Sequence, residues 1–170
     1  VHAKMVREAK GFLEAALTEI VKPSPDRVTP PCPVFGECGG CQWQFMAYDR
    51  QIEAKHQIVV EQLMRIGKLK DIDVRPVWPS VPYGYRQTVA LQADPEKMGF
   101  FKSESHDIVE WSACAVLSND LQKQVDEVKA AGWKGESRIR VSTSGVGYFM
   151  QANKEQNKKM VTHIVESVSR

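Results

Sequence analysis

Three of the four cysteines in this chain lie within ten residues of one another, and the fourth lies far along the sequence. Cys32, Cys38 and Cys41 belong to the stretch PPCPVFGECGGCQWQ, and Cys114 follows Cys41 after seventy-two intervening residues. The glycine pair just before Cys41 has no Cβ atoms, so the backbone amides there can approach a bound group closely. The pattern predicts that the four thiols serve one chemical purpose.

Four kinds of chemistry are compatible with such a pattern. Disulfides need an oxidising compartment, and nothing in the sequence indicates one. Unrelated buried thiols would not gather in a loop of glycine and proline. Zinc is suited to four thiolates, but zinc sites usually pair two short cysteine knuckles. A tight triplet with one remote ligand is typical of a 4Fe-4S cluster, which takes one thiolate per iron, and this is the interpretation that we favour.

The composition is that of a globular protein, and its overall charge identifies no partner. The chain has 170 residues, of which 42% are hydrophobic and 26% charged, and its net charge is +2. Any RNA-binding surface must therefore be a local patch. No apolar run approaches the ~20 residues that span a bilayer, and the first ten residues lack the apolar core of a signal peptide, so export is not expected. A cytoplasmic protein without membrane contact is expected, and the missing initiator methionine suggests a fragment.

The apolar patterns predict an α+β fold, in which an antiparallel β-sheet with flanking helices surrounds the cysteine loop. Alternating residues on both sides of Gly11 predict a hairpin over 1–21. The five prolines that follow predict an extended connector. Further strands are expected over residues 85–92, 98–102 and 106–111, and as two short strands around a Ser-Gly turn within 138–153.

Helical spacing is found at 48–66, at 118–131 and after Asn153. Asn153 and Gln156 have the spacing of a capping box. One face of the first helix is apolar and is formed by Tyr48, Ile52, Val59, Leu63 and Ile66. The opposite face is expected to be solvated and carries Arg50, Lys55, His56 and Arg65. The apolar stripe of the last helix consists of Met160, Val161, Ile164, Val165 and Val168.

The stretch CPVFGECGGCQWQFMAYDRQIEAKHQIVVEQLMRIG closely resembles the iron–sulfur segment of the RNA uracil-5 methyltransferases, above all those that act on 23S ribosomal RNA. The family pattern is C-P-x4-C-G-G-C-x2-Q, followed by a Tyr, a Gln and a Lys on the next helix. The matching residues are Cys32, Cys38, Cys41, Gln44, Tyr48, Gln51 and Lys55. The resemblance continues at GYRQTV, GFFKSESHDIVEWSACAVL and YFMQAN, so it covers nearly the whole chain. It implies that Cys114 is the fourth cluster ligand, although Ala115 replaces the usual proline.

The resemblance also implies contacts with a methyl donor and with RNA. In the family, the F-x-Q-x-N motif supplies a glutamine to S-adenosylmethionine, and Gln151 occupies that position. Arg86 and Phe149 match positions expected to lie near bound RNA. Several aromatic residues could stack on exposed bases, although most aromatic residues pack in a core, and these are Trp43, Tyr83, Tyr85, Phe100 and Phe101. The four scattered histidines receive no chemical role.

Three regions follow from the resemblance. Residues 1–29 would be the C-terminal remnant of a TRAM-like, OB-type β-barrel with its linker. Residues 30–147 would be the central iron–sulfur and RNA-recognition domain. Residues 148–170 would be the truncated start of the S-adenosylmethionine-dependent methyltransferase domain. Only thirty-four residues separate Cys114 from Phe149, where many family members have a longer insertion, so a trimmed central domain is expected.

Family members methylate carbon 5 of uridine after a cysteine thiolate adds to carbon 6, usually on a base extruded from its stack. All four cysteines here are assigned to the cluster and no glycine-rich methyl-donor loop is present. The parent protein is therefore expected to be an RNA uridine-C5 methyltransferase acting on 23S rRNA, whereas this chain alone holds no catalytic residue and is expected to be inactive and monomeric. The alternative is a free-standing zinc- or cluster-containing RNA-binding module without catalytic activity, or an enzyme acting on tRNA instead. A ferredoxin-like electron carrier is disfavoured because the usual run of four cysteines is absent.

Overall fold

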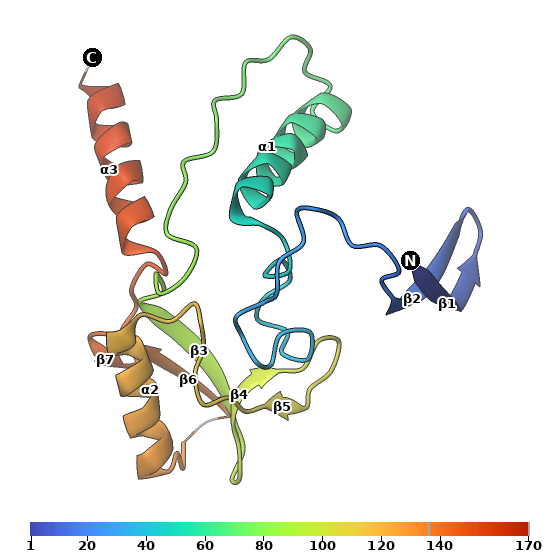
Figure 1. Cartoon of the computed structure of the whole chain (residues 1–170). Coiled ribbons are helices and arrows are strands. Elements are labelled where there is room, and N and C mark those ends of the chain that lie inside the picture. Colours follow the sequence, from blue (N-terminus) through green and yellow to red (C-terminus); the bar gives the residue numbers. More distant parts are fainter. Residues whose placement is uncertain (136, 170) are drawn as a thin grey trace.

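The computed structural model describes residues 1–135 and 137–169, and its centre is a five-stranded antiparallel sheet (Figure 1). The order of the strands across the sheet is β5-β4-β3-β6-β7. Their bounds are Thr88–Ala93 for β3, Met98–Phe101 for β4, Ile108–Val109 for β5, Arg138–Ser142 for β6 and Gly145–Val146 for β7. The expected α+β fold with an antiparallel sheet is confirmed, and the expected meander is seen in β3, β4 and β5.

The core lies between this sheet and helix α2 (Asn119–Ala131). Successive residues of β3 alternate between half-buried and buried, as expected when one face of a strand meets a core. The helix begins as predicted, because the Ser118 hydroxyl accepts the Leu121 N–H at 3.3 Å. The side chains that are fully buried between sheet and helix are Leu91, Leu121, Val125, Ile139 and Val141.

Helix α1 (Tyr48–Arg65) forms where it was expected, but its two faces are not divided into core and solvent as predicted. Val59 and Ile66 of the predicted apolar face are exposed, at 45% and 74%. On the other face, His56 is half-buried, and its Nε2 lies 2.9 Å from the carbonyl oxygen of Val74. The prediction of a solvated face was therefore wrong for His56, because the long connector after the helix folds back against it.

Helix α3 (Lys154–Val168) is also found as predicted, with the Asn153 side chain accepting the Gln156 N–H at 3.0 Å. The reciprocal half of the capping box does not form. Instead the Gln156 amide donates to the carbonyl oxygens of Trp78 and Pro79. The predicted apolar stripe of this helix is exposed along its whole length, and α3 is held through contacts of Gln156, Lys159 and His163 with Trp78 and Pro79.

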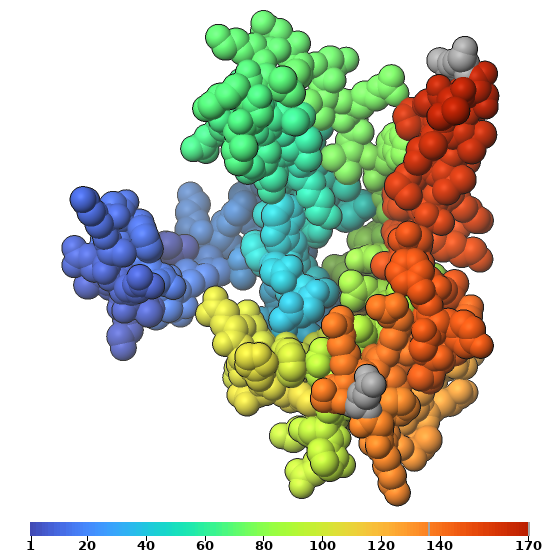
Figure 2. Space-filling view, turned by 180° about the vertical axis from the view of Figure 1, so that it is seen from behind, coloured from blue at the N-terminus to red at the C-terminus, as the bar shows by residue number. Residues whose placement is uncertain are grey.

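The predicted N-terminal hairpin is present as β1 (His2–Ala9) and β2 (Phe12–Glu19). In the described part of the chain these two strands pair only with each other, so a barrel is not formed. The space-filling view shows the hairpin, in dark blue, standing apart from the body of the molecule (Figure 2). No helix among the described residues is long and apolar enough to cross a bilayer.

Candidate metal centre

The cysteine loop is irregular and is anchored to the turn between β4 and β5. The Gly39 N–H donates to the carbonyl oxygen of Phe101 at 2.9 Å, and the Ser103 N–H donates to that of Glu37 at 3.0 Å. A Cβ atom on Gly39 would lie 3.0 Å from the Phe101 oxygen, so glycine permits this close approach. These contacts bring the triplet of cysteines to the edge of the sheet.

All four cysteines line one small pocket, which we call the cysteine pocket. The triplet reaches it from the anchored loop, and Cys114 reaches it from the connection between β5 and α2. The other lining residues are mainly apolar, and no carboxylate or histidine is among them; they are Val34, Phe35, Gly40, Gln44, Arg86, Phe100, Trp111 and Val116. The structure therefore brings together the four residues that the sequence analysis grouped.

The cavity between the thiols is narrow, with a volume of about 20 Å³. Among the described residues, no three cysteine, histidine or acidic side chains are positioned to hold a metal ion. The thiols share a pocket but do not yet converge on one point, so metal binding requires their side chains to turn.

Burial makes this pocket unfavourable for a free thiolate. The pKa of Cys38 is raised above its usual value, first by burial and then by the neighbouring thiols, while the Gly40 N–H at 3.4 Å acts in the opposite direction. Burial likewise raises the pKa of Cys114, and the backbone N–H of Val116 opposes it. A negative charge on either sulfur needs a partner, such as a bound cation.

Three buried polar atoms without a partner border the same pocket. They are Nε of Arg86, Nε1 of Trp111 and Oε1 of Gln44, and no other buried side-chain nitrogen or oxygen is left without a partner in the described part of the chain. Two of them are N–H donors, which fit the anionic sulfur atoms of a thiolate-bound metal centre. The donor set and its surroundings thus fit a 4Fe-4S cluster or a zinc ion, each held by Cys32, Cys38, Cys41 and Cys114.

Of the remaining predicted site residues, Gln151 and Phe149 lie away from the cysteine pocket, whereas Arg86 and Phe100 line it. Gln151 is exposed on the segment before α3, and Phe149 is 69% exposed with its ring 5.7 Å from the Arg140 guanidinium. Arg86 borders the cysteine pocket and is fixed through its backbone to Val116 and Ser118. Phe100 stacks on Trp111 beside the core, which agrees with the core packing expected of most aromatic residues.

Trp111 and Gln122 also contribute to this site, although neither was predicted from the sequence. Trp111 is only 6% exposed, and Gln122 of α2 accepts the Cys114 N–H at 3.1 Å. In the sequence, Gln122 is one polar residue among many on an amphipathic helix, so no local signal could have identified it.

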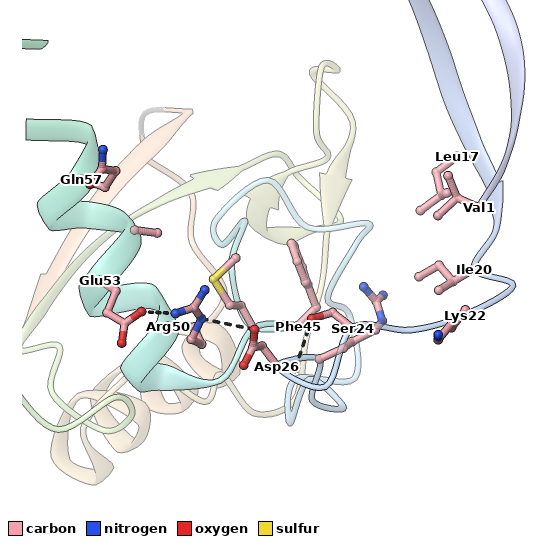
Figure 3. Close-up of a pocket in the computed structure, with 13 residues that line it drawn as sticks. Val1, Leu17, Ile20, Lys22, Ser24, Asp26, Phe45, Arg50, Glu53 and Gln57 are labelled. Atoms are coloured by element: carbon pink, nitrogen blue, oxygen red, sulfur yellow. Dashed lines mark hydrogen bonds and ion pairs between the residues drawn. The ribbon is translucent and has the colours of Figure 1, made fainter. Parts of the chain in front are cut away.

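A larger, open pocket of about 700 Å³ lies between the hairpin and α1 (Figure 3). Leu17 and Ile20 line it from the side of the hairpin. On the side of α1, Arg50 forms ion pairs with Glu53 and with Asp26 of the linker. Arg50 is exposed, as predicted for the solvated face of α1, and its ion pairs join the linker to the helix.

The chain is similar to segments of proteins named RNA methyltransferases. It is 39% identical to one from Clostridium acetobutylicum and 33% identical to one from Aquifex aeolicus, each match covering 76% of this chain but only 30% and 31% of the relative. A third, from Bdellovibrio bacteriovorus, is 31% identical over 94% of this chain and 45% of its own length. All three are named as uncharacterized RNA methyltransferases, and no family model matches the chain. The chain is thus homologous to part of a group of RNA methyltransferases, and it spans about a third of the length of the first of these relatives.

Among solved structures, the chain is similar to the crystal structure of Pyrococcus abyssi tRNA (uracil-54, C5)-methyltransferase in complex with S-adenosyl-L-homocysteine. The TM-score is 0.48 and the sequence identity 24%, and the match covers 83% of this chain and 34% of that one.

Proposed function

We propose that this chain is the metal- and RNA-binding part of an S-adenosylmethionine-dependent RNA (uracil-C5)-methyltransferase, and that its substrate is 23S ribosomal RNA. The observation that carries the proposal is the shared pocket of the four cysteines, bordered by unpartnered N–H groups, in a chain whose relatives are named RNA methyltransferases. Methyl transfer belongs to the longer parent protein, whose remaining two thirds would supply the nucleophile and the methyl-donor site.

In this proposal the four cysteines hold a 4Fe-4S cluster whose main role is structural. The cluster would join the loop around Cys38 to the connection around Cys114, and the N–H groups of Arg86 and Trp111 would donate to its sulfur atoms. Residues 1–29 would continue from a TRAM-like barrel and residues 148–170 would lead into the methyltransferase domain, with Gln151 contacting S-adenosylmethionine. Arg86 and Phe149 would lie near the bound RNA.

A single zinc ion is the second candidate for the same four thiols. The specific observation in its favour is the volume of about 20 Å³, which is close to the room needed by one water molecule. A cubane would require a larger outward movement of the thiols than one ion would. A zinc centre would accompany the alternative of an RNA-binding module without catalysis.

Anaerobic reconstitution of the 170-residue chain with iron and sulfide separates these candidates. The proposal expects about four irons and four sulfides per chain, and a marked loss of both in Cys114→Ser. Ser112→Ala, an exposed change two residues away, serves as the matched control and should retain them. One zinc per chain without sulfide would contradict the cluster and favour the second candidate.

The substrate is tested with the full-length parent protein. Methyl transfer from S-adenosylmethionine to a 23S rRNA fragment is expected to exceed transfer to tRNA, with the product identified as 5-methyluridine. Preferential modification of tRNA would refute the choice of substrate without affecting the metal centre.

A further inference from the structure

A second pocket adjoins the cysteine pocket and has a different character. It has a volume of about 280 Å³ and is lined by aromatic and polar side chains, among them Trp43, Tyr83, Tyr85 and Lys55. We call it the aromatic pocket. Its walls come from the cysteine loop, from α1 and from the segment just before β3. Its volume lies near the lower end of the range of small-ligand sites, which suits one nucleotide.

The lining of the aromatic pocket combines flat rings with positive charge. The Lys55 ammonium lies 6.0 Å from the centre of the Trp43 ring, and Lys55 itself is exposed. Trp43, Tyr83 and Tyr85 are half-buried, so each keeps part of its surface available. No acidic side chain is among the described residues that line this pocket. Aromatic rings beside a cation form a surface that suits a base attached to a phosphate.

A buried acceptor without a partner adds specificity. Gln44 lines the aromatic pocket, is only 7% exposed, and its Oε1 accepts no hydrogen bond in the described part of the chain. Leaving such an acceptor unsatisfied costs free energy, which a ligand N–H would recover. The Watson–Crick edges of unpaired bases carry such N–H groups.

We propose that the aromatic pocket binds one unstacked base of a single-stranded RNA segment. The base stacks on the aromatic rings, Gln44 accepts an N–H from its edge, and Lys55 contacts the adjoining phosphate. This inference rests on the proposed function as an RNA-binding chain and assigns a place on the surface for that binding.

The two pockets are coupled by a common wall. Gly40, Cys41, Gln44 and Val116 line both of them. Because a metal bound by Cys41 would hold the loop around it, the metal centre would also shape one wall of the aromatic pocket.

The affinity for a short fluorescein-labelled single-stranded RNA tests the proposal by fluorescence anisotropy, with the metal-loaded 170-residue chain. Trp43→Ala is expected to weaken binding about tenfold, as loss of base stacking does, and Trp43→Phe to restore most of it. Phe12→Ala, which removes an exposed ring from the hairpin, is the matched control and should change little. Metal content is measured for every variant, and the Lys55→Ala comparison and the crosslinks described next decide the proposal if Trp43→Ala fails to fold.

A charge test runs in parallel. Lys55→Ala should weaken binding and reduce the slope of log affinity against log salt by about one, whereas Lys123→Ala, an exposed lysine on α2, should not. Photocrosslinking with 4-thiouridine in the RNA should label peptides that contain Trp43, Tyr83 or Tyr85.

The possible failures are distinguishable. The wild-type chain could bind RNA tightly while Trp43→Ala and Lys55→Ala leave the affinity unchanged and the crosslinks fall on other peptides. That result would refute base binding in the aromatic pocket but not the proposed function. Absence of RNA binding by the metal-loaded wild-type chain would overturn the pocket together with the RNA-recognition role of this chain.

Discussion

The side-chain oxygen of Gln122 accepts the backbone N–H of Cys114 at 3.1 Å, and the side-chain nitrogen of Gln122 donates to the carbonyl oxygen of Ser112 at 3.3 Å. One residue of α2 thus holds the connection that carries the fourth thiol. Since the cap of α2 and its buried side chains fix the helix against the sheet, the position of Cys114 is determined by the core of the protein.

Replacing Gln122 with alanine should lower metal affinity without removing a ligand. Hydrogen bonds that orient the residues holding a metal are typically worth about 10- to 100-fold in metal affinity. The measurement is the metal content of the chain after incubation with graded concentrations of a chelator. Gln124→Ala is the matched control, because Gln124 lies on the same helix and its amide donates to Glu127 on the exposed side of that helix. Equal retention by both variants would show that Gln122 does not position the site.

Replacing Trp111 with phenylalanine should shift the reduction potential of the proposed cluster downward. The substitution removes an unpartnered N–H but keeps a ring to stack on Phe100, which lies 5.7 Å away. An N–H donated to the cluster favours its more negative, reduced state, so its loss disfavours reduction. A shift on the order of tens of millivolts is expected, since ~59 mV corresponds to a tenfold change in a one-electron equilibrium.

The potential is measured by spectroscopic titration under anaerobic conditions. Trp78→Phe is the control, because Trp78 packs against His163 on α3 and does not line the cysteine pocket. An unchanged potential in Trp111→Phe would argue against a bond from this indole to the cluster.

Lys129 should make the stability of the fold depend on pH. Its ammonium donates to the Trp111 carbonyl oxygen at 2.8 Å, and burial lowers its pKa although Glu110 and Asp126 oppose that change. The unfolded chain therefore binds the proton of the Lys129 ammonium more tightly than the folded chain does. As pH rises through the range just below 10.5, loss of this proton increases the free energy of unfolding.

Urea unfolding gives the free energy of unfolding of the wild-type chain and of Lys129→Met at pH 7 and at pH 10. The effect of Lys129 is the change with pH in the difference between the two proteins. The wild-type chain should gain stability relative to the variant at the higher pH. A loss instead would mean that the pKa of Lys129 is raised in the folded state. Lys123→Met, on an exposed position of the same helix, should show no such trend.

Asn153→Ala should destabilise the chain by about 0.5–2 kcal/mol, the range for loss of an N-cap. The Asn153 side chain caps α3 through the Gln156 N–H and also donates to the Ser80 hydroxyl at 3.0 Å. Chemical denaturation gives the free energy of unfolding. Asn157→Ala, one turn into the helix, should be close to neutral, since alanine favours the helix interior. Similar losses in both variants would contradict the capping role.

Most elements of this fold could be predicted from local signals. The N-terminal residues of α2 and α3, the hairpin turn at Gly11 and the meander all follow from residue spacing. The pairing of β3 with β6 could not be predicted, because no local pattern joins strands so far apart in the sequence. For the same reason the exposure of the apolar stripe on α3 was not foreseen, since periodicity shows which residues share a face but not what covers it.

The grouping of the four cysteines was predicted from residue type and spacing together with the family resemblance, which implied the role of Cys114, whereas their surroundings were not predicted. Gln122, Trp111 and Lys129 act through contacts set by the packing of α2 against the sheet. The assignment of Gln151 and Phe149 came from a motif and remains a prediction, because both lie away from the cysteine pocket.

The N-terminal hairpin of β1 and β2 should exchange its amide hydrogens for deuterium quickly. Nearly every side chain of β1 and β2, including Met5, Phe12 and Leu17, lies in water on both sides of the two-stranded ladder. A lone pair of strands is at best marginal in water, so its amides should take up deuterium long before those of β3, which is paired on both edges. Slow deuterium uptake in β1 and β2 would show that another surface shields the hairpin in solution.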